Sequence, residues 1–385
     1  MVDPTTHRFY YACVQGKPQH AVHPVRDLAA AWDATKAIGF WSSDWWSKEE
    51  ENHDDGDIHH YVSTLSRAVQ ETLAAYDTVG VAEHSTALRI NVDRVETSHL
   101  GHSALYILAT VQALRLGLIP DSAVNRQRVE GLVQGILHQQ RPDGAFVTTF
   151  CHEDGKRDNT FDSENVDNSI RVGIEFYPGQ ALLALLQVQR WGALLVTTQA
   201  TLLPSVERAL NFYAKYHQTY CPDVNYAIWQ LQACAFYDRA VSSSSSSSSK
   251  KLDMAYRYQQ AMTTDLLSSR LWQYDLLKGP SYYPNLSTLA VVCGLDALAD
   301  IYGENSTKTD DPEEHVTLRI ERAVQYLGWS LDRSSSQGQA FRGLGYGGWQ
   351  HRGGVVNRDE QRLDVSGHAI SALIKLQVGH VRATP

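Results

Sequence analysis

Polar and aromatic residues of the types that carry out acid–base chemistry lie just before, or at the start of, several apolar segments of this sequence. The candidates for catalysis are Asp162, Glu175, Tyr177, Asp364 and His368. The candidates for substrate binding are His99, His102, Tyr226, Trp229, Tyr283 and Arg362. If the apolar segments begin around one cavity, these side chains converge there. Flat apolar walls with a few fixed polar groups are typical of small-molecule sites.

Two kinds of chemistry remain open for such a cavity. Asp162 or Glu175 opposite Asp364 would provide the pair of carboxylates that glycoside hydrolysis requires. A pair of histidines, or a tyrosine with an arginine, would instead favour proton abstraction beside a carbonyl or carboxylate, as in epimerases and lyases. In that case Arg362 is a candidate clamp for an acidic group, because its guanidinium binds carboxylates with two hydrogen bonds.

Purely structural roles are open for the same residues. Asp364 and Ser98 are suited to capping the first turn of a helix. Tyr177 and Tyr283 can serve as packing residues with a local hydroxyl partner. The histidines at 99, 102 and 368 can be core residues with satisfied ring nitrogens.

The candidate residues are positioned by helices of two kinds. Apolar helices are expected to start at His99, Tyr177, Asn225, Tyr283 and Val365. Tyr177 and Tyr283 are each followed by proline, which suits the first turn of a helix. Amphipathic helices with apolar residues at i, i+3, i+4 and i+7 are predicted at about 123–140, 204–218, 252–270 and 314–332, and a further helix at about 58–76.

Regular alternation of buried and amphipathic helices predicts an all-α fold in which an inner ring is surrounded by an outer ring. We therefore predict an (α/α)6 toroid as a single domain over residues 46–385, preceded by an extension over 1–45. The serine-rich stretch 242–251 is predicted to be a flexible loop.

Composition and motifs narrow the function classes. The chain has 385 residues and a net charge of −9, which argues against a nucleic-acid-binding surface. No apolar run is long enough to span a membrane and no signal peptide is visible, so a cytoplasmic protein without membrane contact is expected. Phosphate-binding, dinucleotide-binding and metal-binding motifs are absent from the sequence, so no metal and no other cofactor is predicted. The five cysteines have no histidine nearby in sequence, and buried, reduced thiols are expected rather than nucleophiles.

Two segments resemble known toroid proteins. The run Gln139-Gln-Arg-Pro-Asp143-Gly144-Ala-Phe146 resembles the Q-x-x-D-G-x-[FW] turn of α/α-toroid proteins such as terpene cyclases and prenyltransferase β subunits. Tyr177-Pro-Gly-Gln-Ala-Leu-Leu-Ala-Leu-Leu resembles inner-helix starts of N-acylglucosamine 2-epimerase-like and glucuronyl C5-epimerase-like enzymes. The resemblance covers residues about 95–378 and implies a toroid with a carbohydrate-type site. The D-x-D-D motif of class II terpene cyclases is missing, and the epimerase pattern has glutamate where this chain has Gln180.

From these features we expect a carbohydrate-active enzyme, a hydrolase, lyase or epimerase, acting on a sugar, uronic acid or glycan in the central funnel. A terpenoid or prenyl-chain enzyme is one alternative, because the same aromatic side chains would stabilise a carbocation. A toroid that has kept its fold without catalysis, as a scaffold or binding protein, is the other.

Overall fold

A computed structural model describes most of the helical part of the chain. The described residues are 2–10, 12–14, 17–19, 23–42, 55–81, 84–92, 98–150, 168–220, 224–242, 249–268, 288–302, 320–321, 323–324, 331–332, 340–341 and 360–383. Within them the protein is mostly α-helical, as predicted, and its strands are short. The chain divides into two compact units, one formed by residues 1–71 and 263–385 (unit 1) and one by residues 72–262 (unit 2). The domain boundary predicted near residue 45 stays a prediction.

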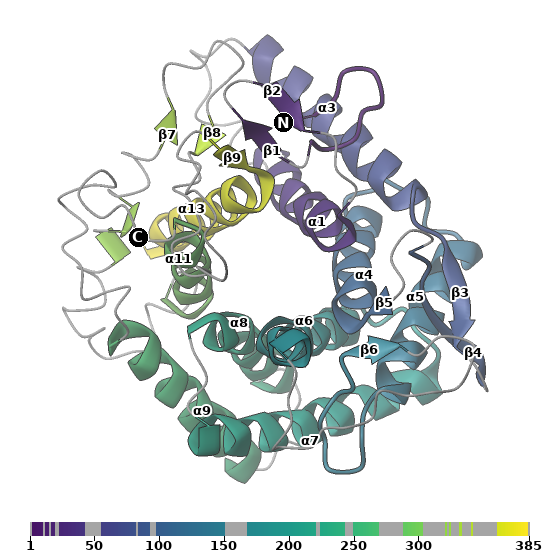
Figure 1. Ribbon diagram of the computed structural model, residues 1–385, viewed down its shortest axis with the longest axis vertical. Helices are drawn as coiled ribbons and strands as arrows, with labels where there is room; N and C mark the ends of the chain where they lie inside the picture. Colours follow the sequence, from purple (N-terminus) through teal and green to yellow (C-terminus); the bar gives the residue numbers. More distant parts are fainter. Residues whose placement is uncertain are drawn as a thin grey trace. The chain divides into compact units, whose positions relative to one another are not determined.

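Unit 1 brings together the two ends of the chain. Helix α1 (Pro24–Trp41) packs on α13 (Leu363–Ala383), which also packs on α11 (Thr288–Tyr302), as the purple, yellow and green helices show in Figure 1. Strand β1 (Ala12–Val14) pairs with β2 (Lys17–Gln19) and with β9 (Glu360–Arg362), antiparallel in both cases. The unit also contains the pair β7 (Leu331–Asp332) and β8 (Ala340–Phe341) and most of α3 (Asp55–Ala74).

Close packing in unit 1 follows from the small residues of α1. Ala29, Ala30, Ala31, Ala34 and Ala37 are all buried, so the backbone of α1 can approach its neighbours closely. Helix α1 lies within residues 1–45, the segment for which the sequence predicts only an extension.

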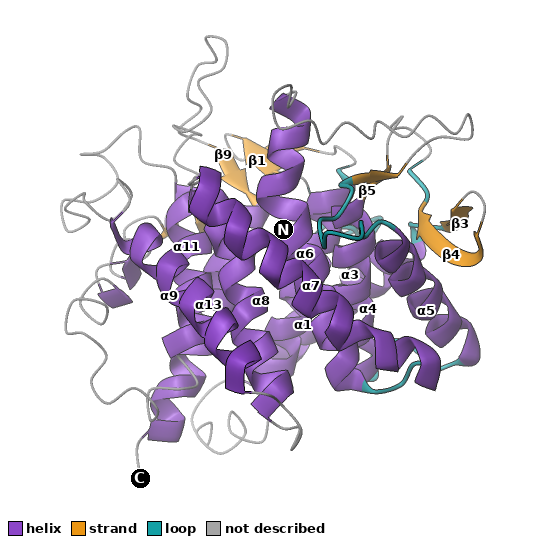
Figure 2. Cartoon of the chain, turned by 90° about the horizontal axis from the view of Figure 1, so that it is seen from below, coloured by secondary structure: helices purple, strands orange, loops and turns teal. Residues whose placement is uncertain are grey.

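Unit 2 consists of two sets of helices. Helix α6 (Asn168–Trp191) packs between α4 (Leu100–Arg115) and α8 (Val224–Ser242). Helix α5 (Ala123–His138) covers α4, and α7 (Val196–Tyr220) covers α6. Helix α9 (Ser249–Ser268) follows α8 in the chain. The hairpin formed by β3 (Thr78–Val81) and β4 (His84–Ile90) lies beside α5 (Figure 2).

Alternation of buried and amphipathic helices is confirmed within unit 2. Nearly every residue of α4 is buried, whereas α5 buries one face that includes Val129, Leu132 and Ile136. A helix that is apolar on all sides must be covered on all sides, and an amphipathic helix needs cover on one side only.

The Q-x-x-D-G-x-F segment forms a turn that docks on α7. Gln140 donates from Nε2 to the carbonyl of Ser205 at 2.9 Å. Gly144 has a φ of +101°, and a Cβ at this position would lie 2.3 Å from the carbonyl oxygen of Arg208. Glycine is therefore required here both by the backbone conformation and by the close approach. The backbone N–H of Phe146 donates to the Tyr213 hydroxyl at 2.9 Å, which ties the end of the turn to the same helix.

Three predicted helix ends differ from the structure. Helix α6 begins at Asn168, so Pro178 lies inside the helix and the predicted start at Tyr177 is wrong. Proline is favourable in a first turn, but α6 runs through it because its flanking residues pack between α4 and α8. The helix predicted over about 314–332 does not extend to its predicted end, because Leu331 and Asp332 form strand β7. The serine-rich segment is helical at both ends, since α8 ends at Ser242 and α9 begins at Ser249.

Candidate functional site

The first turn of α4 is anchored by a short antiparallel strand pair in unit 2. Strand β5 (Ser98–His99) pairs with β6 (Thr149–Phe150), and His99 lies opposite Thr149. The backbone N–H of Leu100 donates to the carbonyl of Thr148 at 2.8 Å, and the Ser98 hydroxyl donates to the carbonyl of Ile90 at 2.9 Å. His99 is therefore held at a fixed place at the N-terminus of α4.

His102 closes this first turn and has a defined tautomer when it is neutral. The backbone N–H of His99 donates to His102 Nδ1 at 3.1 Å. Because Nδ1 accepts a hydrogen bond, a neutral His102 carries its proton on Nε2. The two imidazole rings meet edge to face, with 5.3 Å between their centroids.

Tyr177 brings α6 against this turn. Its ring stacks on the His99 ring, with centroids 5.1 Å apart and an angle of 30° between the planes. Gly101 leaves room for the tyrosine ring, because a Cβ on this residue would lie 2.4 Å from Tyr177 Cδ1. On the other edge of the ring, the Cβ position of Gly173 is 3.5 Å from Cδ2, which is ordinary van der Waals contact. Helices α4 and α6 therefore flank the Tyr177 ring on both edges.

Burial shifts the two stacked groups in opposite directions. It lowers the pKa of His99, which favours a neutral imidazole, and raises the pKa of Tyr177, which favours a protonated hydroxyl. At neutral pH the site thus places a proton acceptor next to a proton donor. Titratable groups whose pKa values are driven apart by their environment are typical of acid–base sites.

Buried polar atoms without a hydrogen bond lie on α6 beside this pair and on α8. Gln180 Oε1 lies 2.6 Å from the Cβ position of Gly101 and has no hydrogen-bond partner among the described residues. The same is true of both side-chain polar atoms of Gln230 on α8. Buried polar atoms are nearly always satisfied, so these are free to bind polar groups of a ligand or water.

Glu175 and Trp229 lie on the helices that form this site. Glu175 is buried on α6, two residues before Tyr177. Trp229 on α8 is also buried, and its Cβ would lie 2.5 Å from a Cβ placed on Gly179 of α6. The structure thus gathers His99, His102 and Tyr177 directly and brings Trp229 against the same helix.

Tyr226 is placed in the core of unit 2 instead. Its ring is fully buried, and its hydroxyl donates to the carbonyl of Tyr213 at 2.9 Å and is 2.8 Å from the Tyr258 hydroxyl. Burial raises its pKa well above the ordinary value. The hydroxyl is therefore occupied by contacts with α7 and α9.

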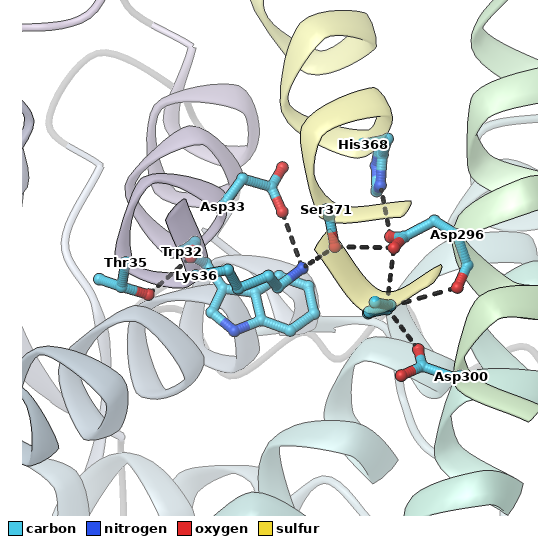
Figure 3. A network of polar contacts seen from close by, with 9 residues as sticks. Trp32, Asp33, Thr35, Lys36, Asp296, Asp300, His368 and Ser371 are labelled. Carbon is cyan, nitrogen blue, oxygen red and sulfur yellow. Dashed lines mark hydrogen bonds and ion pairs between the residues drawn. The ribbon is translucent and has the colours of Figure 1, made fainter. Parts of the chain in front are cut away.

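His368 belongs to a buried polar network in unit 1, shown in Figure 3. Its Nδ1 is 3.2 Å from Asp296 Oδ2, and Asp296 Oδ1 accepts a hydrogen bond from Ser371 and forms an ion pair with Lys375, each at 2.7 Å. Lys375 also donates to Asp300 Oδ2 at 2.6 Å. These residues come from α11 and α13, so the network fastens the two helices to each other.

Helix α1 enters the same network through Lys36. Its Nζ donates to Asp33 Oδ1 at 2.8 Å and to Ser371 Oγ at 2.9 Å, and it lies 3.4 Å from the centroid of the Trp32 ring (Figure 3). Burial opposes ionisation of Asp296, but Lys375 and Lys36 outweigh it and hold its pKa below the ordinary value. Asp296 is therefore a carboxylate although it is fully buried.

Four predicted site residues cannot be placed at the level of side chains. Asp162 and Tyr283 lie outside the described residues. Arg362 is the last residue of β9 and Asp364 is in the first turn of α13, and the structure describes only the backbone of both.

Sequence reasoning missed Gln180, Gly101 and the partners of His368. A signal for the network exists in the sequence, because Asp296 and Asp300 are charged residues four positions apart in an otherwise apolar helix. Charges on a buried helix face must be paired. Nothing in the sequence indicates that their partners are in α13.

Comparisons with known proteins give no assignment. The chain matches no known protein family, and no characterised protein is significantly similar to it in sequence. None of the described helices is long and apolar enough to cross a membrane. Among the described residues, no group of three or more His, Cys, Asp or Glu side chains is arranged to hold a metal ion.

Proposed function

We propose that this protein is a carbohydrate-active enzyme that removes and returns protons on a uronic-acid-like sugar, as a lyase or an epimerase. The observation that carries this proposal is the stacked His99–Tyr177 pair, whose pKa values are shifted in opposite directions. At neutral pH this leaves a neutral imidazole that can accept a proton beside a protonated hydroxyl that can donate one, the two roles that abstraction beside a carboxylate requires.

Each residue has a distinct role in this proposal. His99 takes the proton from the carbon next to the sugar carboxylate, and Tyr177 supplies a proton, either to the leaving oxygen in a lyase or to the opposite face in an epimerase. Gln180 and Gln230 bind sugar hydroxyl groups through their unpaired amide atoms. An apolar ligand would leave these buried amide atoms without a hydrogen bond, so the site should bind ligands with hydroxyl groups more tightly than apolar ones.

Support for proton abstraction comes from the contact between the His99 and Tyr177 rings, both of which are described. Hydrolysis would need Glu175 or Asp162 opposite Asp364; Asp162 and the side chain of Asp364 lie outside the described residues, so that carboxylate pair stays a prediction.

The proposal keeps the (α/α)6 toroid as its architecture. Support comes from unit 2, where α4, α6 and α8 are the buried helices and α5 and α7 cover them. In such a ring the first turn of α4 and the adjoining part of α6 would face the funnel.

The test measures proton exchange directly. The full-length protein is incubated in D2O with polysaccharides that contain glucuronate, galacturonate or mannuronate, and deuterium incorporation and unsaturated products are followed by NMR. We expect exchange with at least one substrate, and loss of it in Tyr177→Phe and His99→Asn with an unchanged circular dichroism spectrum. Tyr256→Phe is the control, since Tyr256 is 57% exposed on α9. Exchange at the wild-type rate in both site variants, or no reaction with any uronate, would refute the proposal.

A further inference from the structure

Three side chains of unit 1 are arranged as a nucleophile, a base and an orienting carboxylate. Cys293 and Asp296 are three residues apart on α11, so they lie on the same face of that helix. His368 of α13 reaches this face of α11, because its Nδ1 is 3.2 Å from the Asp296 carboxylate, and the Cys293 thiol helps to raise the pKa of its imidazole. The sequence does not indicate this arrangement, because the cysteine and the histidine are far apart along the chain.

The Asp296 carboxylate is fixed so that one oxygen serves His368. Its Oδ1 accepts a hydrogen bond from Ser371 and pairs with the Lys375 ammonium group, and Oδ2 is the oxygen that faces the imidazole (Figure 3). A carboxylate held in this way orients the imidazole ring and stabilises its positive charge. With Nδ1 directed at Asp296, Nε2 is the nitrogen left for the thiol.

The surrounding charges favour a protonated His368. Among the described contacts of the network, three carboxylates (Asp33, Asp296 and Asp300) face two ammonium groups (Lys36 and Lys375). A proton on His368 adds a third positive charge to this set. The thiol of Cys293, three residues before Asp296 on the same helix, is the proton source on this face.

Cys234 provides a comparison within the same chain. It is a free, buried cysteine on α8, like Cys293 on α11. Burial raises the pKa of the Cys234 thiol, so it remains protonated at neutral pH. Buried thiols of this kind are inert, whereas thiols next to a histidinium react as thiolates.

We propose that Cys293 is a nucleophilic thiol, with His368 as its proton acceptor and Asp296 as the residue that orients His368, and that it is a site of covalent modification by small, uncharged electrophiles. Small reagents are specified because Cys293 is 8% exposed, and uncharged ones because the nearby charges already pair with one another. In the reaction Cys293 Sγ forms a bond to the electrophilic carbon. The leaving group departs with its electron pair, and the thiol proton stays on His368 until it passes to solvent. This inference does not depend on the proposed carbohydrate chemistry.

The test compares both cysteines in one sample. The native full-length protein is treated with iodoacetamide between pH 5.5 and 9, and alkylation of Cys293 and Cys234 is quantified by mass spectrometry of the same digest. We expect Cys293 to react at least about tenfold faster than Cys234 at pH 6.5, with a rate that changes little up to pH 9. An ordinary thiol would instead gain roughly tenfold per pH unit below its pKa of about 8.5.

Variants show whether Cys293 reacts because His368 activates its thiol or only because the reagent can reach it. His368→Gln is expected to slow Cys293 alkylation at pH 6.5 by about tenfold or more and to restore the ordinary rise with pH. His217→Gln is the matched control, because His217 is another buried histidine, on α7, and its loss should leave Cys293 unchanged. Circular dichroism confirms that each variant is folded. Equal rates for the two cysteines, no alkylation of Cys293 in the native protein, or a Cys293 rate unaffected by His368→Gln would overturn the proposal.

Discussion

At the residue scale, the position of Tyr177 depends on a missing side chain. Gly101→Ala would place a methyl group 2.4 Å from Tyr177 Cδ1, and the ring cannot easily move away because it stacks on His99 and has Gly173 along its other edge. We expect a loss of about 1–3 kcal/mol in the free energy of unfolding, as for other overpacked sites, together with a strong loss of activity. Urea denaturation measures the first effect and the deuterium-exchange assay the second.

Gly80→Ala is the control for this prediction. Gly80 lies in β3, and a Cβ there would meet no atom within 4 Å. This variant should be as stable as the wild type or slightly more stable, since alanine costs less conformational entropy than glycine. A Gly101→Ala protein with wild-type stability and activity would show that Tyr177 is not held as described.

His368 predicts how stability changes with pH. Burial alone would lower its pKa, but Cys293 and Asp296 raise it well above the ordinary value. A raised pKa adds stability below about pH 6.5, the value in the unfolded chain, and this stability is lost as pH rises toward the folded value. In a Cys293→Ser variant, where no thiol titrates beside the histidine, the free energy of unfolding should therefore fall above pH 6.5, by up to about 1.4 kcal/mol per pH unit.

Denaturant unfolding at several pH values checks this prediction by comparing Cys293→Ser with the double variant Cys293→Ser/His368→Gln, because in the wild type the proton lost by the Cys293 thiol offsets the one gained by His368. The double variant lacks the titrating group, so its free energy of unfolding should fall less steeply than that of Cys293→Ser above pH 6.5. Parallel curves for the two proteins would mean that His368 has the same pKa in the folded and unfolded chains.

At the element scale, the turn after α5 depends on one hydroxyl of α7. Tyr213→Phe removes the acceptor for the buried N–H of Phe146 and should cost about 1–3 kcal/mol of unfolding free energy. Because the turn leads directly to Thr148 and Thr149, which anchor the start of α4, we also expect faster hydrogen exchange at residues 146–150. Tyr256→Phe removes an exposed hydroxyl and should change neither quantity. Unchanged stability and exchange in Tyr213→Phe would contradict this account of the turn.

The sequence predicts the bounds of a helix well where the pattern of apolar and polar residues within that segment is enough to determine its structure. The amphipathic pattern at 123–140 corresponds to α5, which ends at His138, and the apolar segment after His99 corresponds to α4. The start of α6 could not be predicted in the same way. Proline within the segment indicated a boundary at Tyr177, but packing on both sides of α6 outweighs the missing backbone hydrogen bond.

The candidate sites show the same limit. Residue type and position at helix starts were enough to select His99, His102 and Tyr177, which the fold brings together. Selecting Cys293 and Asp296 as partners of His368 required knowing that α11 packs on α13. Packing between distant helices depends on the shapes of whole surfaces, and local sequence patterns contain little of that information.

At the scale of the whole molecule, the two units differ in how the chain builds them. Unit 2 is one continuous stretch of chain, residues 72–262, with its own core of α4, α6 and α8. Unit 1 combines both ends of the chain, and its helices α1, α11 and α13 share the network around Asp296. The stability of α1 is therefore tied to residues more than two hundred positions away in the sequence.

This difference predicts a selective effect of Asp296→Asn. The substitution leaves Lys375 and His368 with a neutral partner in a buried site, and breaking a buried ion pair costs about 3–5 kcal/mol. We expect faster hydrogen exchange in α1, α11 and α13 and unchanged protection in α4, α6 and α8, because compact units with separate cores open separately. Hydrogen–deuterium exchange mass spectrometry of the full-length variant resolves all six helices in one experiment. Equal loss of protection in α4, α6 and α8 would show instead that the two units unfold as one cooperative structure.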